Sequence, residues 1–285
     1  MSAGTLFVVA TPIGNLEDLT FRALRTLREV DLIAAEDTRR TAKLLAHYEI
    51  RKPLVSLREQ NETRETPRLI ARLQSGENIA LVSDAGTPTI ADPGARFVGA
   101  ARRAQLPIVP IPGPTALATL LSVSGFSGDQ FVFLGFPPAS GAARDRWFHQ
   151  LATEKRVVLF FEAPHRAKRT LEELINSVKR PIIVGRELTK VNEQLVELTN
   201  SGDIDRINII GEFVVIVAGE ASANAQDIDP KDVTAIFGRL TENETIDDDL
   251  AIRLVSLHLN VPHTAVKNIV KKARFAARRH AGPLP

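Results

Sequence analysis

The sequence predicts an α/β protein with two α/β domains, residues 1–122 and 123–221, and a small helical extension at 228–285. Two observations support this division. Short apolar runs alternate with helix-forming segments through the first two-thirds of the chain, as in a parallel sheet covered by helices. The alternation stops at 221–230 (ASANAQDIDP), where small and polar residues indicate a linker.

The first domain begins with an apolar run at 6–10 (LFVVA), which predicts a buried strand. A helical repeat and a second strand follow, at Leu19, Ala23, Leu27 and Val30, and at 31–37 (DLIAAED). Thr66-Pro67 predicts the start of the next helix, as an N-cap followed by proline at the first helical position, and Gly76 its end. Further strands are expected at 78–83 and 107–111, and Gly113-Pro114-Thr115 begins another helix.

The second domain repeats the pattern with more closely spaced strands, which favours a mixed sheet. Strands are expected at 131–136, 156–162, 181–187, 194–198 and 213–220. A helix is expected at 164–179, opened by Pro164. The segment 122–129 (SVSGFSGD) is the expected hinge between the domains.

The extension is expected to be helical and basic. Leu250, Leu254 and Leu257 fall on one helix face, and 259–275 has the rhythm of helix, tight turn, helix. The stretch 227–249 is mostly acidic, whereas no carboxylate follows Asp249. The last stretch carries the cationic residues Lys267, Lys271, Lys272, Arg274, Arg278 and Arg279. This asymmetry points to a polyanionic partner, although a solvated helix face remains an alternative.

Composition excludes several classes of protein. The absence of cysteine among the 285 residues excludes disulfides and thiolate metal sites, and six scattered histidines predict no metal site. No apolar run approaches the roughly 20 residues that span a bilayer, and no signal peptide is recognised, so a cytoplasmic protein without a membrane partner is expected. Rossmann, Walker A and zinc-protease motifs are absent.

Three turn-rich segments lie where predicted strands end. They are 9–20 (VATPIGNLEDLT), 82–94 (VSDAGTPTIADPG) and 110–121 (PIPGPTALATLL). Open α/β sheets bind ligands at the carboxyl ends of their strands. Glycines let a backbone approach a ligand, and prolines hold the turns rigid. The segments therefore predict a small-ligand site built mostly from main chain, with ordinary strand–helix turns as the alternative.

Together with AAEDTR (34–39), FFEAPHR (160–166) and GRELTK (185–190), these segments resemble the family of ribosomal RNA small-subunit methyltransferase I, within the tetrapyrrole-methylase superfamily. The resemblance runs from about Leu6 to Glu220 and includes every motif in order. It implies a two-domain tetrapyrrole-methylase-like fold, with S-adenosylmethionine bound in the cleft between the domains. It also implies 2′-O-methylation of the ribose of a cytidine in the decoding region of 16S rRNA, within the small ribosomal subunit, by a homodimer.

The resemblance also implies which residues surround the methyl donor. They are Pro12, Asp84, Gly86, Thr87, Pro88, Ile90, Thr115 and Ala116 from the first domain, and Phe161, Glu162, Leu188, Gly211 and Glu212 from the second. The carboxylate of Asp84 suits a donor that carries a sulfonium and an amino group. A helix cap or loop brace is the alternative role for Asp84.

The residue that removes the hydroxyl proton remains open. Methyl transfer requires oxygen, methyl carbon and sulfur in line, and a carboxylate or a lysine of lowered pKa could assist. The candidates are Glu36, Asp37, Glu187, Lys190 and Glu193. Arg39 and Arg40 are expected to hold RNA phosphates, as are Lys267, Lys271, Arg274 and Arg278 of the extension. The alternative is a solvated salt bridge or a brace between domains for the candidate bases and the two arginines, and a solvated helix face for the cations of the extension.

Two other functions compete with an RNA methyltransferase. One is a methylase of a corrinoid or porphyrin precursor, against which AAEDTR, EAPHR and the basic tail argue. The other is a nucleic-acid-binding regulator without catalysis, against which the complete set of loop motifs argues. Stabilisation of the fold by S-adenosylmethionine would speak against the regulator, because a ligand of the folded state raises its melting temperature.

Overall fold

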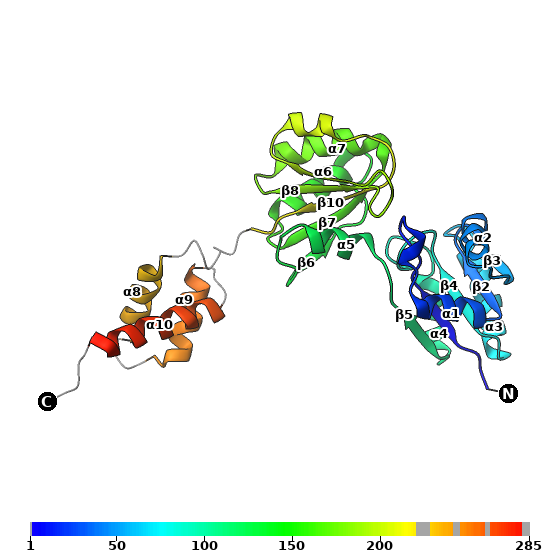
Figure 1. Ribbon diagram of the computed structural model, residues 1–285, viewed down its shortest axis with the longest axis horizontal. Helices are drawn as coiled ribbons and strands as arrows, with labels where there is room; N and C mark the ends of the chain where they lie inside the picture. The colour runs from blue at the N-terminus through cyan, green and yellow to red at the C-terminus, as the bar shows by residue number, and fades with distance from the viewer. Residues whose placement is uncertain (1, 221–228, 242–245, 260–262, 281–285) are drawn as a thin grey trace. The chain divides into compact units, whose positions relative to one another are not determined.

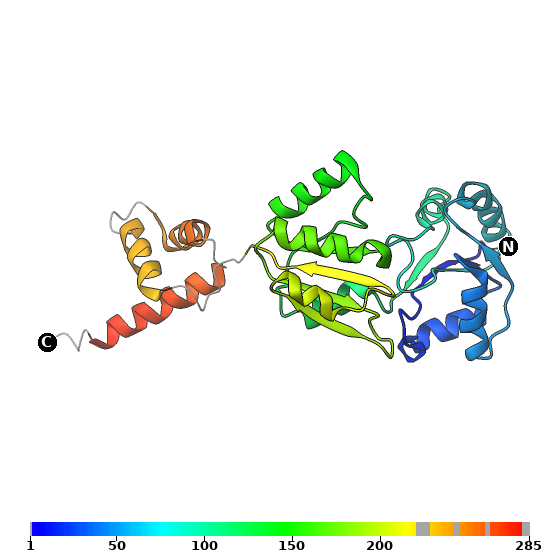
Figure 2. The ribbon, with the colours of Figure 1, turned by 90° about the horizontal axis from the view of Figure 1, so that it is seen from above.

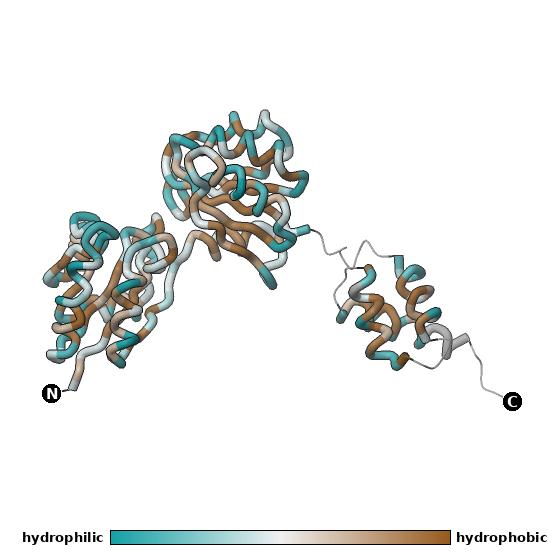
Figure 3. Tube along the Cα trace, turned by 180° about the vertical axis from the view of Figure 1, so that it is seen from behind, coloured by the Kyte–Doolittle hydropathy of each residue, from teal (hydrophilic) through white to brown (hydrophobic). Residues whose placement is uncertain are grey.

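The computed structural model describes residues 2–220, 229–241, 246–259 and 263–280. The chain forms two compact units, Met1–Ala218 and Gly219–Pro285. The first unit contains two five-stranded sheets, labelled along the chain in Figure 1. Strands of both sheets are predominantly apolar, as the brown tube in Figure 3 shows, because each sheet is covered by other elements on both faces.

The first sheet is entirely parallel, with strand order β3-β2-β4-β1-β5. Its strands are β1 (Leu6–Val9), β2 (Leu32–Ala35), β3 (Leu54–Ser56), β4 (Ile79–Val82) and β5 (Ile108–Ile111). Its helices are α1 (Phe21–Glu29), α2 (Thr38–His47), α3 (Glu62–Gln74) and α4 (Ala95–Arg103), with a 3₁₀ turn η1 at Leu16–Asp18. One core cluster joins the sheet to α3 and α4, and another joins it to α1 and α2. The predicted parallel α/β layering is therefore confirmed.

The predicted start of α3 at Thr66-Pro67 is wrong. The helix begins at Glu62, so Pro67 lies inside it. Asn61 fixes the preceding turn: its side chain accepts from the Arg58 amide at 2.7 Å and donates to the Ser56 carbonyl at 3.0 Å. These contacts outweigh the loss of one backbone hydrogen bond at Pro67. Helices α2 and α4 and the short edge strand β3 are additional to the predicted elements.

The second sheet is mixed, as predicted, with strand order β6-β7-β10-β8-β9. Its strands are β6 (Phe131–Phe133), β7 (Val157–Glu162), β8 (Ile182–Arg186), β9 (Gln194–Leu198) and β10 (Phe213–Val217). Its helices are α5 (Ala116–Val123), α6 (Gly141–Thr153) and α7 (Pro164–Ser177), with a 3₁₀ helix η2 at Ser201–Arg206. Figure 2 shows β10 as the yellow arrow through the middle of the sheet.

Helix α5 packs on the second sheet, on the face opposite α6 and α7 (Figure 1). Its Leu117 and Leu120 belong to a core with Leu159, Val214 and Ile216. The domain boundary expected between residues 122 and 123 stays a prediction. Helix α5 precedes this boundary in sequence but packs against the second sheet, which follows it. The predicted opening of α7 by Pro164 is confirmed.

The second unit is a group of three helices. They are α8 (Pro230–Thr241), α9 (Asp248–Leu259) and α10 (His263–His280). The core contains Ala251, Ile252 and Val255 of α9, whereas Leu250 and Leu254 are exposed. The side chain of Leu257, the predicted turn at 260–262 and most of the predicted linker, 221–228, lie outside the described residues. Within the described chain, no helix has the length and apolar character needed to cross a membrane.

Candidate functional site

The turns that leave β1, β4 and β5 are joined by hydrogen bonds. Thr11 and Gly86 form a two-way backbone bridge, with N···O distances of 2.9 and 3.0 Å. The Thr87 hydroxyl donates to the Pro114 carbonyl at 3.2 Å. The three turns predicted to hold a ligand therefore lie together at the carboxyl edge of the first sheet, where parallel α/β sheets bind small molecules.

Two of the segments around this edge have strained backbones. Thr89 and Ala91, after β4, have φ of 72° and 64°, and Glu187 and Thr189, after β8, have φ of 51° and 66°. Such left-handed conformations cost non-glycine residues on the order of 1–3 kcal/mol each and concentrate at ligand sites. The Glu193 carboxylate accepts from the Thr189 amide at 2.5 Å, which assigns this candidate base a bracing role.

A cavity of about 310 Å³ is lined by both strained segments. Its volume lies in the range of small-molecule sites. All but three of the residues predicted to surround a methyl donor line it, namely Gly86, Thr87, Ile90, Thr115, Ala116, Phe161, Glu162, Leu188, Gly211 and Glu212. The wall also contains residues that were not predicted: Ile13, Ala85, Ala91, Asp92, Phe136, Ala163, Pro164, Phe213 and Val214.

Pro12, Asp84 and Pro88 do not line the cavity. Asp84 instead braces the turns: its Oδ1 accepts from the Asp37 amide at 2.8 Å, and its Oδ2 lies 3.5 Å from the Arg40 guanidinium. The structure therefore favours the alternative role of Asp84 as a loop brace. Asp92 is the aspartate in the cavity wall, ten residues after β4 ends and inside the same motif.

Asp92 has an unusual environment. Burial raises the pKa of its carboxyl, and the negative charges of Glu36, Asp84 and Glu212 raise it further, to about 7, against a lowering by the Ser83 hydroxyl. Its ordinary value is 3.8. Burial and the charge of Asp84 also raise the pKa of Glu36, whose carboxylate accepts from the Asp84 amide at 3.4 Å. A shared pattern of half-buried, interacting carboxyls is typical of functional sites.

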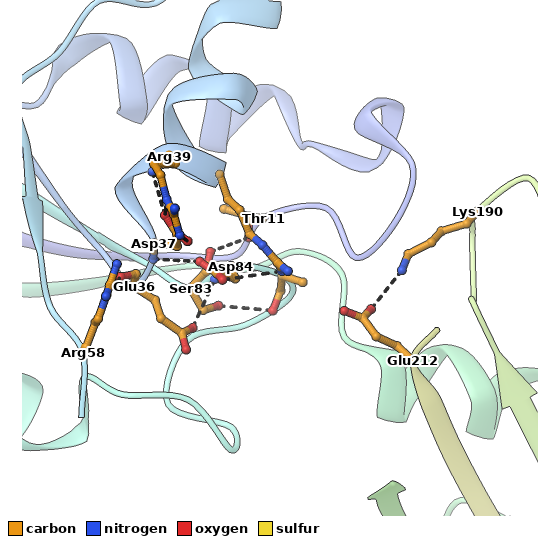
Figure 4. A network of polar contacts seen from close by, with 11 residues as sticks. Thr11, Glu36, Asp37, Arg39, Arg58, Ser83, Asp84, Lys190 and Glu212 are labelled. Atoms are coloured by element: carbon orange, nitrogen blue, oxygen red, sulfur yellow. Dashed lines mark hydrogen bonds and ion pairs between the residues drawn. The ribbon is translucent and has the colours of Figure 1, made fainter. Parts of the chain in front are cut away.

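Asp37 caps α2 and does not reach into the cavity wall. It accepts from the Arg39 amide at 2.9 Å and pairs with the Arg39 guanidinium at 2.8 Å (Figure 4). These bonds hold the pKa of Asp37 well below its ordinary value. A carboxylate so strongly stabilised in its charged form is a weak base. The Arg39 side chain itself is 80% exposed, so its contact with RNA phosphates stays a prediction.

Lys190 lies between two carboxylates, 2.8 Å from Glu187 Oε1 and 3.1 Å from Glu212 Oε2; Figure 4 shows the pair with Glu212. Burial lowers its pKa, but the bonds to both carboxylates outweigh burial and the net shift is upward. Lys190 therefore lacks the lowered pKa that a lysine acting as a base would need. The Lys190 bond also lowers the pKa of Glu187, so both groups are held in their charged forms.

Glu162 is 3% exposed and holds the start of α7. Its carboxylate accepts from the Ala163 amide at 2.7 Å and the Thr170 hydroxyl at 2.6 Å, and pairs with Arg166 at 2.7 Å. Beside it, Phe161 contacts Phe133 and Phe136, with ring centroids 5.0 and 5.6 Å apart. Buried polar contacts thus position an aromatic wall of the cavity.

The predicted RNA-binding residues fall into different environments. Lys267 and Lys271 are exposed on α10, as predicted for a cationic face. Arg274 instead pairs with Asp248 and covers the Phe237 ring at 5.2 Å, so it stabilises the second unit. The side chain of Arg278 lies outside the described residues. No metal-binding group of three or more acidic or histidine side chains occurs in the part of the chain that the structure describes.

Comparisons with known proteins agree with the geometry. The family model of the Tetrapyrrole (Corrin/Porphyrin) Methylases matches residues 5–204. Proteins named "Ribosomal RNA small subunit methyltransferase I" are 47% identical over 226 residues in Pseudomonas aeruginosa, covering 77% of this chain and 80% of the relative. The corresponding protein of Xylella fastidiosa is 49% identical over 233 residues, covering 79% and 85%. That of Thermotoga maritima is 43% identical over 221 residues, covering 76% and 99%.

Solved structures share the fold at low sequence identity. Diphthine synthase has a TM-score of 0.61 and 16% identity, covering 75% of this chain and 90% of that one. The uroporphyrin-III C-methyltransferase of Thermus thermophilus complexed with S-adenyl homocysteine has a TM-score of 0.54 and 17% identity, covering 75% and 97%. At these identities the likeness establishes the fold alone.

Proposed function

Since the chain belongs to the ribosomal RNA small subunit methyltransferase I family of the tetrapyrrole methylases, we propose that it methylates the 2′-hydroxyl of a cytidine ribose in the decoding region of 16S rRNA. At the coarser level, family membership makes it a methyltransferase that uses S-adenosylmethionine and acts on ribosomal RNA. A substrate within the small ribosomal subunit, a homodimeric assembly and a cytoplasmic location belong to the same proposal.

The observation that carries the proposal is the composition of the cavity. Three turns of the first sheet supply small residues and main chain, and Phe161, Phe136 and Leu188 supply apolar surface. A flat apolar wall beside backbone groups suits an adenosine, whose ring is stacked and whose polar edge is hydrogen-bonded. Glu212 supplies negative charge in the same wall, which suits a cationic sulfonium.

The acceptor can be tested directly. Small ribosomal subunits from cells that lack this activity are incubated with the protein and methyl-labelled S-adenosylmethionine, and the nucleosides are separated after complete digestion. We expect label in 2′-O-methylcytidine. Label in a methylated base would contradict the ribose assignment. A parallel reaction with a uroporphyrinogen as acceptor tests the tetrapyrrole alternative, and label there in place of RNA would overturn the substrate class.

We also expect the second unit to contribute to RNA affinity through α10. The double variant Lys267→Gln/Lys271→Gln removes two exposed cations from one helix face. Each lost phosphate contact reduces the slope of log affinity against log salt by about 0.7–0.9, so the slope should become shallower by up to about 1.8. Lys231→Gln, at the start of α8, is the matched control. Filter binding to small subunits over a salt series measures the slopes, and equal slopes for all three proteins would exclude α10 from the RNA interface.

A further inference from the structure

Asp92 does not have the structural role that is usual for an aspartate just before a helix. Such residues commonly cap the helix that follows. Here the cap of α4 is supplied from α3, because the Glu62 carboxylate accepts from the amides of Gly94, Arg96 and Phe97 at 3.2, 2.9 and 3.2 Å. Asp92 lies two residues before that cap and lines the cavity.

The cationic side chains near the cavity pair with groups other than Asp92. Arg40 pairs with Asp84, and Lys190 bridges Glu187 and Glu212. Arg58 donates to the Glu36 carbonyl at 3.2 Å. Within residues 2–220, no ion pair joins Asp92 to a cationic side chain. The groups that act on Asp92 are three carboxylates, from Glu36, Asp84 and Glu212, and the Ser83 hydroxyl.

We infer that Asp92 is the residue that accepts the proton of the ribose hydroxyl during methyl transfer. This inference rests on the proposed function. The hydroxyl oxygen forms a bond to the methyl carbon, and its proton passes to a carboxylate oxygen of Asp92. The bond between carbon and sulfur breaks, and its electron pair returns to sulfur, which converts the cationic sulfonium to a neutral thioether. Asp92 then releases the proton to water.

The environment of Asp92 suits this task better than the environments of Asp37 and Glu187. A general base works best when its pKa lies near the working pH. Burial and the neighbouring carboxylates raise the pKa of Asp92 to about 7, whereas hydrogen bonds hold the pKa values of Asp37 and Glu187 below the ordinary range.

The test uses Asp92→Asn, Asp92→Glu and the control Asp129→Asn, an exposed aspartate outside the cavity wall. At pH 8 we expect Asp92→Asn to lower kcat by about 10²–10⁴-fold and Asp92→Glu to restore part of it. The acid limb of the kcat/KM profile near pH 7 should disappear in Asp92→Asn. Affinity for S-adenosylmethionine should stay within about threefold, an equilibrium effect below 1 kcal/mol, and Asp129→Asn should match the unmodified protein.

Two outcomes would overturn the inference. A kcat of Asp92→Asn within about threefold of the unmodified enzyme would remove Asp92 from the chemistry, while ribose methylation by the unmodified enzyme would leave the proposed function intact. Weaker binding of S-adenosylmethionine but unchanged binding of S-adenosylhomocysteine would assign Asp92 to holding the sulfonium. If the unmodified enzyme labels no ribose in small subunits, the proposed function itself fails.

A thermal readout tests the state of Asp92 without any substrate. Because the folded-state pKa is raised from 3.8 to about 7, ionisation of Asp92 costs the folded protein stability as the pH rises across that interval. Asp92→Asn removes this cost. We expect its melting temperature to exceed that of the unmodified protein by about 2–4 °C at pH 8 and to match it at pH 4. An equal difference at both pH values would contradict the half-buried, ionisable environment on which the inference depends.

Discussion

Replacement of Gly86 by valine is expected to weaken binding of S-adenosylmethionine by at least about 100-fold, or about 2.7 kcal/mol. Gly86 is buried in the cavity wall and has a φ of 76°, which β-branched residues avoid. A Cβ at this position would lie 3.2 Å from Ile13 Cγ2, and the two γ-methyl groups need further space. The backbone bridge to Thr11 restricts the movement that would relieve this crowding. Isothermal calorimetry measures the effect.

Gly125→Val is the matched control for this loss. Gly125 has nearly the same φ, 73°, but no atom lies within 4 Å of the position that a Cβ would occupy, and it is not part of the cavity wall. Both variants therefore carry the same kind of backbone strain, and only Gly86→Val fills the cavity edge. If a folded Gly86→Val protein binds the donor with unchanged affinity, the turn after β4 is not part of the donor site.

Replacement of Glu162 by alanine is expected to reduce the free energy of unfolding by about 3 kcal/mol, because it removes the buried carboxylate of a largely buried ion pair with Arg166. Arg166 would lose the carboxylate 2.7 Å away, and its Nε already has no hydrogen-bond partner in the described structure. The Thr170 hydroxyl would lose its acceptor while still receiving a bond from Arg144 Nη2 at 2.9 Å. Chemical denaturation followed by circular dichroism measures the loss.

Asp205→Ala serves as the control for this prediction. Asp205 Oδ1 lies 3.4 Å from Lys168 Nζ, and both side chains are exposed, so solvent screens their attraction. We expect no resolvable change in the denaturation midpoint. If Glu162→Ala loses no more stability than Asp205→Ala, the result contradicts the view that the buried contacts of Glu162 hold the start of α7.

Local signals in the sequence were sufficient for much of the fold. Pro164 predicted the start of α7 because proline suits the first helical position whatever surrounds it. The same reasoning failed at Pro67, where Asn61 and Glu62 start the helix earlier through contacts with Arg58 and the α4 amides. Those partners lie up to 35 residues away in sequence, so a local pattern could not reveal them.

The candidate site was predicted better as a set of turns than as individual side chains. Glycine and proline in the motifs mark where backbone approaches a ligand, and these turns do line one cavity. Residue type alone could not show which charged side chains line the cavity and which form ion pairs. Asp84 and Asp92 both belong to the turn after β4, and only the fold determines that the first pairs with Arg40 and the second lines the cavity. Likewise, the sequence suggested Arg274 as a phosphate ligand, whereas the fold places Asp248 beside it.

Hydrogen exchange with and without saturating S-adenosylmethionine tests the central claim most directly, namely that this cavity binds the methyl donor. Bound ligand slows exchange at the amides that it contacts or rigidifies. We predict increased protection in the three segments that contribute residues to the cavity wall, namely 84–92, 187–190 and 211–214, and no change in α8 or α9. Protection confined to other segments, or none at a saturating donor concentration, would contradict the assignment of this cavity as the methyl-donor site.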